Sequence, residues 1–141
     1  MKVIAIATAA LLSFTVSSAQ AETIQEMVTR KAADHGVPIK LAHAVILTES
    51  GYNPKVRGQR GEYGLGQILC RTAKGEGFRG NCNELTNPET NLEYSMLYLR
   101  EALDAANGDV CGASTLYSAG LMVKPGKSAY CRLILKRMEK L

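Results

Sequence analysis

Apolar side chains that recur every three to four residues are the feature that most restricts how this sequence can fold. The longest such pattern covers about residues 88–106 and begins after Asn87-Pro88, which suit a helix cap and a first turn. One face of the predicted helix carries Leu92, Ser95, Met96, Leu99, Ala102 and Leu103. No stretch shows the two-residue alternation of a strand, and no internal repeat is present. The pattern therefore predicts an all-α or mostly α fold.

Two shorter patterns precede this helix. The first covers about residues 24–34 and begins with Thr23 and Glu26 in the arrangement of a capping box. The second presents one apolar face and is predicted to run to Glu49 or Ser50, where a glycine ends it.

The stretches 52–66 and 75–87 are rich in glycine and polar residues, so we predict that both are irregular. Beyond the longest helix, two short helices are expected over about 111–118 and 127–139. A Pro-Gly turn separates them.

The first 21 residues have the three-part layout of a secretory signal peptide. Lys2 is followed by an apolar run over 3–16 and by small residues that end at Ala21. The apolar run is shorter than the roughly 20 residues that a membrane span needs. Cleavage after Ala21 would leave residues 22–141 as one domain in the periplasm or outside the cell.

Four cysteines follow the predicted cleavage site: Cys70, Cys82, Cys111 and Cys131. An even number in a small exported domain indicates two disulfides, for which three connectivities exist. We expect Cys70–Cys82 and Cys111–Cys131, because each pairing closes a short loop and would stabilise the fold by about 3 kcal/mol. Zinc binding is not indicated, since there is no Cys-x-x-Cys pair and both histidines are distant from the cysteines.

Charge and motifs exclude several functions. Without Lys2, the chain has 16 basic and 13 acidic residues, a net charge of about +3. The basic residues are scattered along the sequence, so nucleic acid binding is not predicted. Motifs of phosphate-binding loops, zinc proteases and serine hydrolases are absent, and we predict a monomer that needs no cofactor or metal.

Four short motifs are candidates for function. They are Glu49-Ser50-Gly51-Tyr52-Asn53-Pro54, Gly64-Leu65-Gly66-Gln67, Asn91-Leu92 with Tyr98-Leu99, and Leu116-Tyr117-Ser118-Ala119-Gly120. In this order and spacing they resemble the catalytic domain of the soluble lytic transglycosylases, within the superfamily of lysozyme-like folds that includes goose-type lysozyme. The resemblance covers about residues 37–122. It implies a single lysozyme-like helical domain that acts on the glycan strands of peptidoglycan.

Glu49 is the candidate catalytic residue. It is predicted to lie at the C-terminal end of an apolar helix, where the helix dipole disfavours a negative charge. In a cleft with apolar walls the pKa of Glu49 would rise, so that the carboxyl could hold a proton near neutral pH. The resemblance implies the same role, because the family carries its catalytic Glu at the matching position.

The resemblance also implies a reaction that uses a single carboxyl group. Glu49 would protonate the oxygen between N-acetylmuramic acid and N-acetylglucosamine, and then accept the proton of the muramic 6-hydroxyl as this oxygen attacks the anomeric carbon. The product would be a 1,6-anhydro sugar. Two alternatives remain open, namely a hydrolytic muramidase with Glu62 as a second carboxylate and a peptidoglycan-binding protein without catalysis.

Four further residues match family positions that bind substrate or assist the catalytic Glu. Ser50 would lie near the reacting N-acetyl group or cap its helix. Gln67 would contact a sugar or Glu49. The hydroxyl of Tyr117 would lie at Glu49 or the reacting centre unless Tyr117 belongs to the core, and Tyr98 would belong to the scaffold and line the cleft wall.

Three positions depart from the family pattern. Gly66 stands where Met is common, Ser95 where a helix Gly is usual, and Ser118 where Asn is usual. We expect the missing Met to widen a subsite. Small enzymes of this type often open the wall for a secretion system, a pilus or a flagellum, so the resemblance permits such a partner.

Overall fold

A computed structural model of the chain describes residues 20–141, and the predicted signal peptide lies almost entirely outside this range. The described part contains six α-helices, one 3-10 helix and two isolated β-bridges, so the prediction of a mostly helical fold is confirmed. In chain order the helices are α1 (Ile24–Asp34), α2 (Ile39–Ser50), α3 (Cys70–Gly75), the 3-10 helix η1 (Cys82–Thr86), α4 (Pro88–Ala105), α5 (Val110–Ala119) and α6 (Ala129–Met138). Within residues 20–141 no helix has both the length and the apolarity that crossing a bilayer requires.

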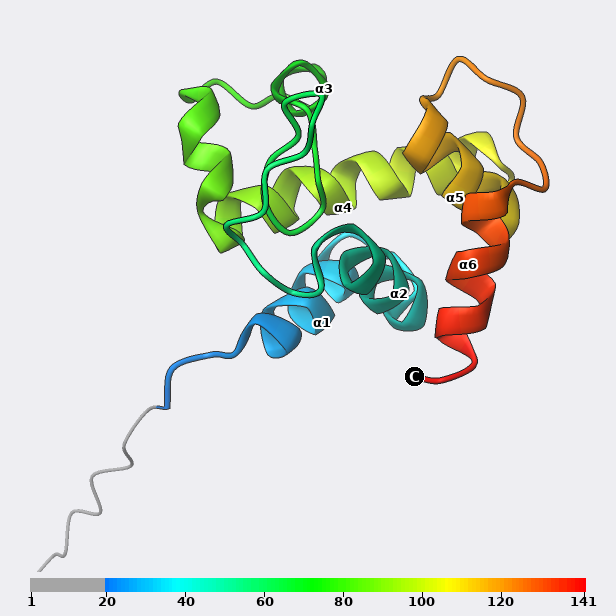
Figure 1. The fold of residues 1–141 in the computed structure, drawn as a ribbon, viewed down its shortest axis with the longest axis horizontal. Coiled ribbons are helices and arrows are strands. Elements are labelled where there is room, and N and C mark those ends of the chain that lie inside the picture. Colours follow the sequence, from blue (N-terminus) through cyan, green and yellow to red (C-terminus); the bar gives the residue numbers. More distant parts are fainter. Residues whose placement is uncertain (1–19) are drawn as a thin grey trace, which may run out of the picture.

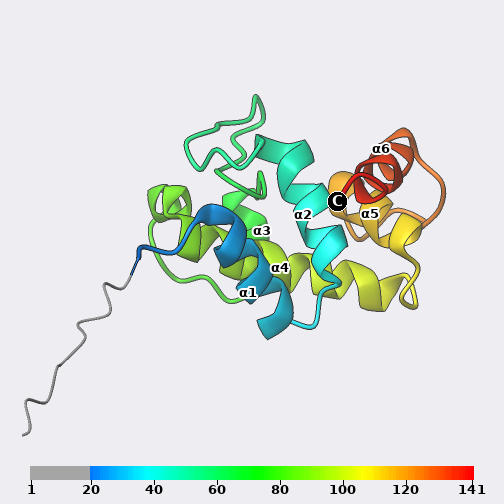
Figure 2. The same ribbon diagram turned by 90° about the horizontal axis from the view of Figure 1, so that it is seen from below.

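Helix α4 is the central element: α1, α3, η1 and α5 pack against it, while α2 packs against α1 and α6, and α6 also packs against α5 (Figures 1 and 2). Asn87 caps the start of α4 by accepting a hydrogen bond from the backbone N–H of Thr90 at 3.2 Å, and Pro88 is the first residue of the helix. Its apolar face is buried from Leu92 to Leu103. Helix α1 packs against this helix near one end, and α5 packs near the other.

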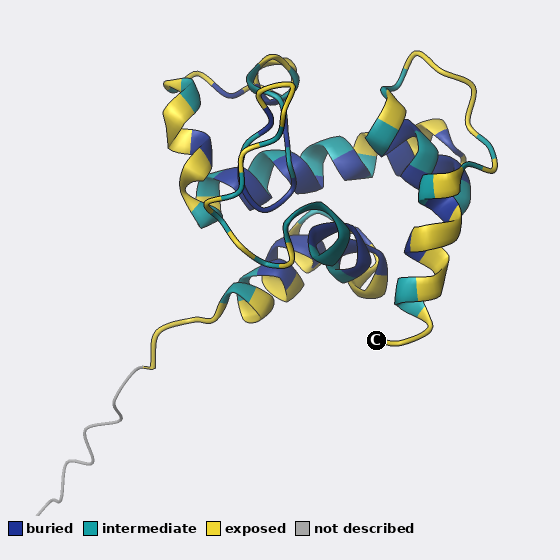
Figure 3. Ribbon diagram, in the orientation of Figure 1, coloured by how far each residue is buried: buried dark blue, intermediate teal, exposed yellow. Residues whose placement is uncertain are grey.

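The buried side chains form two clusters. Figure 3 marks the buried residues along the helices. The larger one unites α1, α2, α4, α5 and α6 and includes Leu41, Ile46, Leu92 and Leu116. A smaller one lies under α3 and η1 and contains Ile68, Ala73, Phe78 and Leu85. Each fully buried leucine or isoleucine stabilises the fold by roughly 2 kcal/mol. The small cluster attaches the loop region to α4, and this attachment builds one wall of the site described below.

Both predicted disulfides are present. Cys70 and Cys82 join α3 to η1 across a Cα–Cα distance of 5.5 Å, and Cys111 and Cys131 join α5 to α6 across 5.0 Å. The first bond braces the small cluster. The second fixes the position of α6, which otherwise follows a long loop.

The 3-10 helix η1 lies within the stretch 75–87 that we predicted to be irregular, and α3 lies almost entirely between the two predicted irregular stretches, where no element was predicted. Helix α3 has six residues and η1 five, too few for a periodic pattern to appear. A capping box starts η1, with the Asn81 side chain accepting from Asn83 N–H and the Glu84 carboxylate accepting from Asn81 N–H at 2.9 Å. Local capping and a disulfide therefore order a stretch that periodicity could not identify.

Candidate active site

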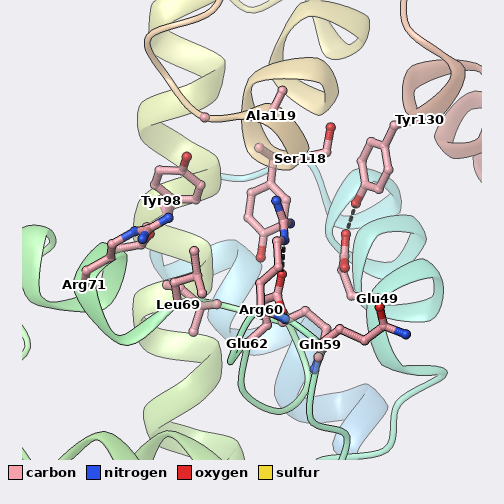
Figure 4. Close-up of a pocket in the computed structure, with 16 residues that line it drawn as sticks. Glu49, Gln59, Arg60, Glu62, Leu69, Arg71, Tyr98, Ser118, Ala119 and Tyr130 are labelled. Carbon is pink, nitrogen blue, oxygen red and sulfur yellow. Dashed lines mark hydrogen bonds and ion pairs between the residues drawn. The ribbon is translucent and has the colours of Figure 1, made fainter.

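A pocket of about 620 Å³ lies between α2, α4, α5 and α6, and the segment 58–72 forms its remaining wall (Figure 4). The lining is largely polar: four charged and four uncharged polar side chains lie beside three tyrosines and three aliphatic side chains. Glu49 lines it from the last turn of α2, which ends where Gly51 adopts the left-handed conformation at φ 58°. The end of this helix therefore places the Glu49 carboxyl in the pocket wall.

Glu49 is largely buried, and burial raises its pKa above the ordinary value of 4.5. The hydroxyl of Tyr130 donates a hydrogen bond to Glu49 Oε1 at 2.5 Å and opposes this rise. The negative charge of Glu62 raises the pKa further, and the positive charge of Arg60 lowers it. The net effect is a raised pKa, so Glu49 can act as a proton donor.

Tyr130 is a site residue that the sequence reasoning missed. It lies in the first turn of α6, 81 residues from Glu49, and next to Cys131 of the second disulfide (Figure 4). Burial raises the pKa of Tyr130, and the negative charge of Glu49 raises it further, so the phenol remains a hydrogen-bond donor. The Cys111–Cys131 pairing was the available signal, because it predicts that position 130 lies beside α5.

Tyr117 and Tyr98 both line the pocket, and their rings lie 5.4 Å apart. The hydroxyl of buried Tyr117 donates to the carbonyl of Gly66 at 2.7 Å, and burial raises the pKa of this phenol. Its hydrogen bond therefore supports the loop behind the pocket, and the hydroxyl bonded to Glu49 is that of Tyr130. Tyr98 forms part of the pocket wall.

Gln67 lines the pocket and also holds the loop. Its Nε2 donates to the carbonyls of Val56 at 3.1 Å and Gly64 at 2.9 Å. Its backbone has φ 48°, which is unusual for a residue with a side chain. The side-chain nitrogen of Gln67 is therefore occupied by these two hydrogen bonds. The predicted contact with a sugar would have to be made by the side-chain oxygen.

Ser50 does not line the pocket. Its hydroxyl donates to the carbonyl of Ile46 at 3.1 Å, one turn back in α2. This arrangement agrees with the helix-end alternative, and the substrate contact of Ser50 stays a prediction without support from its placement.

Asn91 organises the segment that carries Gln67. Its Oδ1 accepts from Gly66 N–H at 2.8 Å, and its Nδ2 donates to the carbonyls of Tyr63 at 2.7 Å and Leu85 at 2.8 Å. The residue is completely buried, so these bonds replace its lost hydration. One amide on α4 thereby connects the pocket loop, η1 and the central helix.

Gly66 packs directly against this helix. A Cβ atom placed on Gly66 would lie 2.2 Å from Ser95 Oγ and 2.8 Å from Tyr117 Oη. The expectation that the missing Met widens a subsite is therefore wrong at this position, because Ser95 fills the adjoining space and Gly66 does not line the pocket. The two departures from the family pattern, Gly66 and Ser95, compensate each other sterically.

Glu62 and Arg60 lie on the loop side of the pocket, away from Tyr130 (Figure 4). Glu62 is 8% exposed and accepts hydrogen bonds from Arg60 Nε at 2.7 Å and from Arg60 N–H at 2.9 Å. Burial raises the pKa of Glu62, but bonds from its own and the Arg60 backbone and from the Arg60 guanidinium outweigh burial. Its pKa is held below the ordinary value, so Glu62 is an anion.

Within residues 20–141, no group of three or more histidine, cysteine, aspartate or glutamate side chains is arranged to bind a metal ion. The pocket lining contains two carboxyl groups, with a raised pKa for Glu49 and a lowered pKa for Glu62, together with two guanidinium groups and three phenols.

A model of the transglycosylase SLT domain family matches residues 26–130. The match covers most of the chain, so the chain belongs to this family, and the resemblance inferred from the four motifs is confirmed.

Solved structures show the same fold. The 70 kDa soluble lytic transglycosylase SLT70 from Escherichia coli is 25% identical with a TM-score of 0.63, and the match covers 81% of this chain and 18% of that one. An inactive variant of the lytic transglycosylase Slt from Pseudomonas aeruginosa is 22% identical, with a TM-score of 0.63 and coverage of 79% and 20%. A complex of the 70-kDa soluble lytic transglycosylase with bulgecin A is 24% identical, with a TM-score of 0.62 and coverage of 81% and 18%. The chain thus spans about a fifth of the length of these larger proteins.

Proposed function

We propose that this protein is a peptidoglycan lytic transglycosylase with Glu49 as its single acid and base. The bond cleaved is the β-1,4 linkage between N-acetylmuramic acid and N-acetylglucosamine. The observation that carries the proposal is a largely buried carboxyl with a raised pKa, hydrogen-bonded to Tyr130 in the main pocket of a transglycosylase-family fold.

In the first step, Glu49 donates its proton to the glycosidic oxygen, and the bond from this oxygen to the anomeric carbon breaks. In the second, the muramic 6-oxygen attacks the anomeric carbon from within the same sugar and forms the 1,6-anhydro ring. Its proton passes to the Glu49 carboxylate, which restores the acid. Because the nucleophile belongs to the substrate, no second carboxylate has to activate water.

Tyr130 has a defined part in this cycle. Its hydroxyl donates to Glu49 Oε1, so the bond becomes stronger when Glu49 is ionised after the first step. The phenol therefore stabilises the intermediate carboxylate and fixes its orientation. Tyr98 provides a ring surface along which the sugar chain can lie, and the buried ring of Tyr117 packs against it.

The test is mass spectrometry of purified peptidoglycan after digestion. We expect products that end in 1,6-anhydro-muramic acid, and Glu49→Gln is expected to lower the rate of their formation by about a thousand-fold or more. Full activity of Glu49→Gln would refute the proposal. Reducing ends in place of anhydro ends would support the hydrolytic alternative instead.

That alternative is a muramidase in which Glu62 activates water. The observation in its favour is that Glu62 lies in the same pocket and is ionised. Against it, both carboxylate oxygens of Glu62 already accept hydrogen bonds from Arg60. We therefore favour the single-acid reaction. The family assignment and the buried carboxyl also favour an enzyme over a protein that only binds the wall.

The proposed site of action is the bacterial cell wall, outside the cytoplasm. Two disulfides and the predicted signal peptide support this location, since disulfides persist in oxidising compartments. A secretion, pilus or flagellar assembly as partner stays a prediction from the family resemblance.

A further inference from the structure

The backbone turn that follows Glu49 is strained. Gly51 has φ 58° and Tyr52 has φ 63°. The backbone N–H of Asn53 donates to the carbonyl of Ser50 at 3.1 Å. Two positive φ values closed by such a hydrogen bond are typical of a type I′ turn, in which glycine, asparagine and aspartate dominate. A tyrosine at the second central position is therefore unfavourable, and its presence requires a contact that holds it there.

The side chain of Tyr52 makes this contact. It folds back along α2, and its hydroxyl lies 2.8 Å from Nδ1 of His43, nine residues earlier in the chain. The Tyr52 ring also packs against the larger core cluster, and its centroid lies 5.9 Å from that of the His43 ring. The hydrogen bond therefore spans about two turns at the end of α2, and these turns include Glu49.

Thr29 on α1 contacts the other ring nitrogen of His43. Thr29 Oγ1 lies 2.9 Å from His43 Nε2, and the single hydroxyl proton of Thr29 is donated to the carbonyl of Gln25 at 3.1 Å. Thr29 Oγ1 therefore accepts from Nε2–H, which leaves Nδ1 of the neutral ring to accept from the Tyr52 hydroxyl. Burial lowers the pKa of His43 and so favours the neutral ring. One continuous series of hydrogen bonds thus connects α1, α2 and the turn.

We propose that the Thr29–His43–Tyr52 series is a positioning device for Glu49: it holds the strained turn, prevents the end of α2 from fraying, and keeps the carboxyl in the pocket. This inference rests on the proposed function, because it takes Glu49 as the acid. None of the three residues lines the pocket, so they act on Glu49 through the backbone and do not touch substrate.

The contacts around the pocket indicate which kinetic constant should respond. The opposite wall is held separately, because Asn91 on α4 bonds to Gly66 and Tyr63. That wall should therefore keep its place when the series is broken. The Glu49 carboxyl is bonded to Tyr130, but its backbone belongs to the last turn of α2. Fraying of this turn would move the carboxyl and leave the wall intact, so kcat should fall while KM is kept.

The test measures kcat and KM for the wild type, Tyr52→Phe, His43→Leu and the double variant, with Tyr94→Phe as a control outside the pocket. The temperature is one at which circular dichroism shows every variant folded. We expect each single substitution to lower kcat about five-fold and to keep KM within about two-fold of wild type. The double variant should be no slower than either single variant, because both substitutions remove the same bond. The control should match the wild type.

A conservative substitution separates positioning from general packing. His43→Asn should restore most of the kcat lost in His43→Leu, since an asparagine oxygen can take the place of Nδ1 as acceptor.

Three kinetic outcomes would overturn the inference. An unchanged kcat in Tyr52→Phe would show that the bond does not position Glu49. Losses that follow only the fraction of folded protein would give the series a purely structural role. Additive losses in the double variant would mean that the two side chains act separately. A wild type that forms no anhydro ends would instead refute the proposed function, and hydrogen exchange would then still decide whether the series holds the turn.

Hydrogen exchange measured by NMR tests the series without substrate. The backbone N–H groups of Gly51 and Asn53 donate to the carbonyls of Leu47 and Ser50, so both should be protected in the wild type. In Tyr52→Phe we expect both to exchange about five-fold faster. Exchange in the wild type at the rate of an unstructured peptide, or equal exchange in the two proteins, would contradict the inference. The measurement stays decisive if the histidine variants fail to fold.

Discussion

Gly66 and Ser95 illustrate how the structure constrains single residues of the pocket loop. Ser95 Oγ also donates to Asn91 Oδ1 at 3.2 Å, so the serine belongs to the hydrogen-bonded group that holds the loop. Gly66 is not among the glycines with a positive φ, so alanine is disfavoured there by contact alone. The two positions should therefore behave as a coupled pair.

We predict that Gly66→Ala lowers the free energy of unfolding by about 2 kcal/mol, because its methyl group would overlap Ser95. In a Ser95→Gly background the same substitution should cost at least about 1 kcal/mol less. Urea denaturation of the four proteins of the double-mutant cycle measures this coupling. Additive effects would show that the loop shifts freely and that the contact is unimportant.

Tyr130 makes a further prediction at the residue scale. Tyr130→Phe removes a hydrogen bond that stabilises the Glu49 carboxylate, so the pKa of Glu49 should rise and the alkaline limb of kcat/KM should move to higher pH. We also expect about ten-fold lower kcat at the optimum, because the carboxyl loses its orientation. Tyr94→Phe, outside the pocket, is the control and should have little effect on either quantity. A limb that stays in place would mean that the bond is not maintained in solution.

Among the helices, α6 contributes to the pocket although it lies far from α2 in the sequence. It packs against α2 and α5, and it contributes Tyr130 from its first turn. Ser128 caps it by accepting from Cys131 N–H at 3.0 Å. The start of α6 is thus fixed by a cap and a disulfide at the position where it meets the pocket.

The two disulfides should therefore differ in their effect on activity. Replacing either cysteine pair with alanine is expected to cost about 3 kcal/mol of stability. Only loss of Cys111–Cys131 should also reduce kcat and move the alkaline limb upward, as in Tyr130→Phe, because α6 loses its attachment to α5. The comparison requires a temperature at which circular dichroism shows both variants folded. Equal kinetic losses would contradict this account.

Most long elements were predictable from the sequence, because each has an apolar face and a recognisable end. The Thr23–Glu26 capping box is present, with Thr23 N–H donating to Glu26 at 2.8 Å, and α4 follows Asn87 as predicted. Helices α3 and η1 were too short for periodicity. Tyr130 was not identified because its role depends on how α6 packs, and no local pattern encodes that packing.

The candidate site was predictable only where a motif marks it. Glu49, Gln67, Tyr98 and Tyr117 line one pocket, but the hydrogen-bond partners of Gln67 and Tyr117 could not be read from sequence spacing. The missing Met at position 66 was misinterpreted because the compensating serine lies 29 residues further along the chain. Only the structure shows that one residue fills the space next to another that is distant in sequence.

For the whole molecule, the buried acid implies a stability that depends on pH. Because the folded pKa of Glu49 is raised, the folded state binds more protons than the unfolded state between about pH 4.5 and that raised value. The contribution of Glu49 to stability is therefore complete below pH 4.5 and is lost as pH rises through the folded pKa.

Glu49→Gln should consequently raise the melting temperature by about 3 °C at pH 8, which corresponds to about 1 kcal/mol, and leave it unchanged at pH 4. Thermal unfolding followed by circular dichroism at both pH values checks the prediction. A pH-independent difference would mean that the carboxyl is hydrated and not buried.

The bond between Cys111 and Cys131 has one more consequence. In a bacterial cytosol, where thiols are kept reduced, a freshly made chain would lack this bond, and α6 would hold Tyr130 less firmly against Glu49. The proposed activity would then be lower in the compartment of synthesis and would reach its full level only after oxidation. Formation of the disulfide would thus be the step that completes the proposed active site.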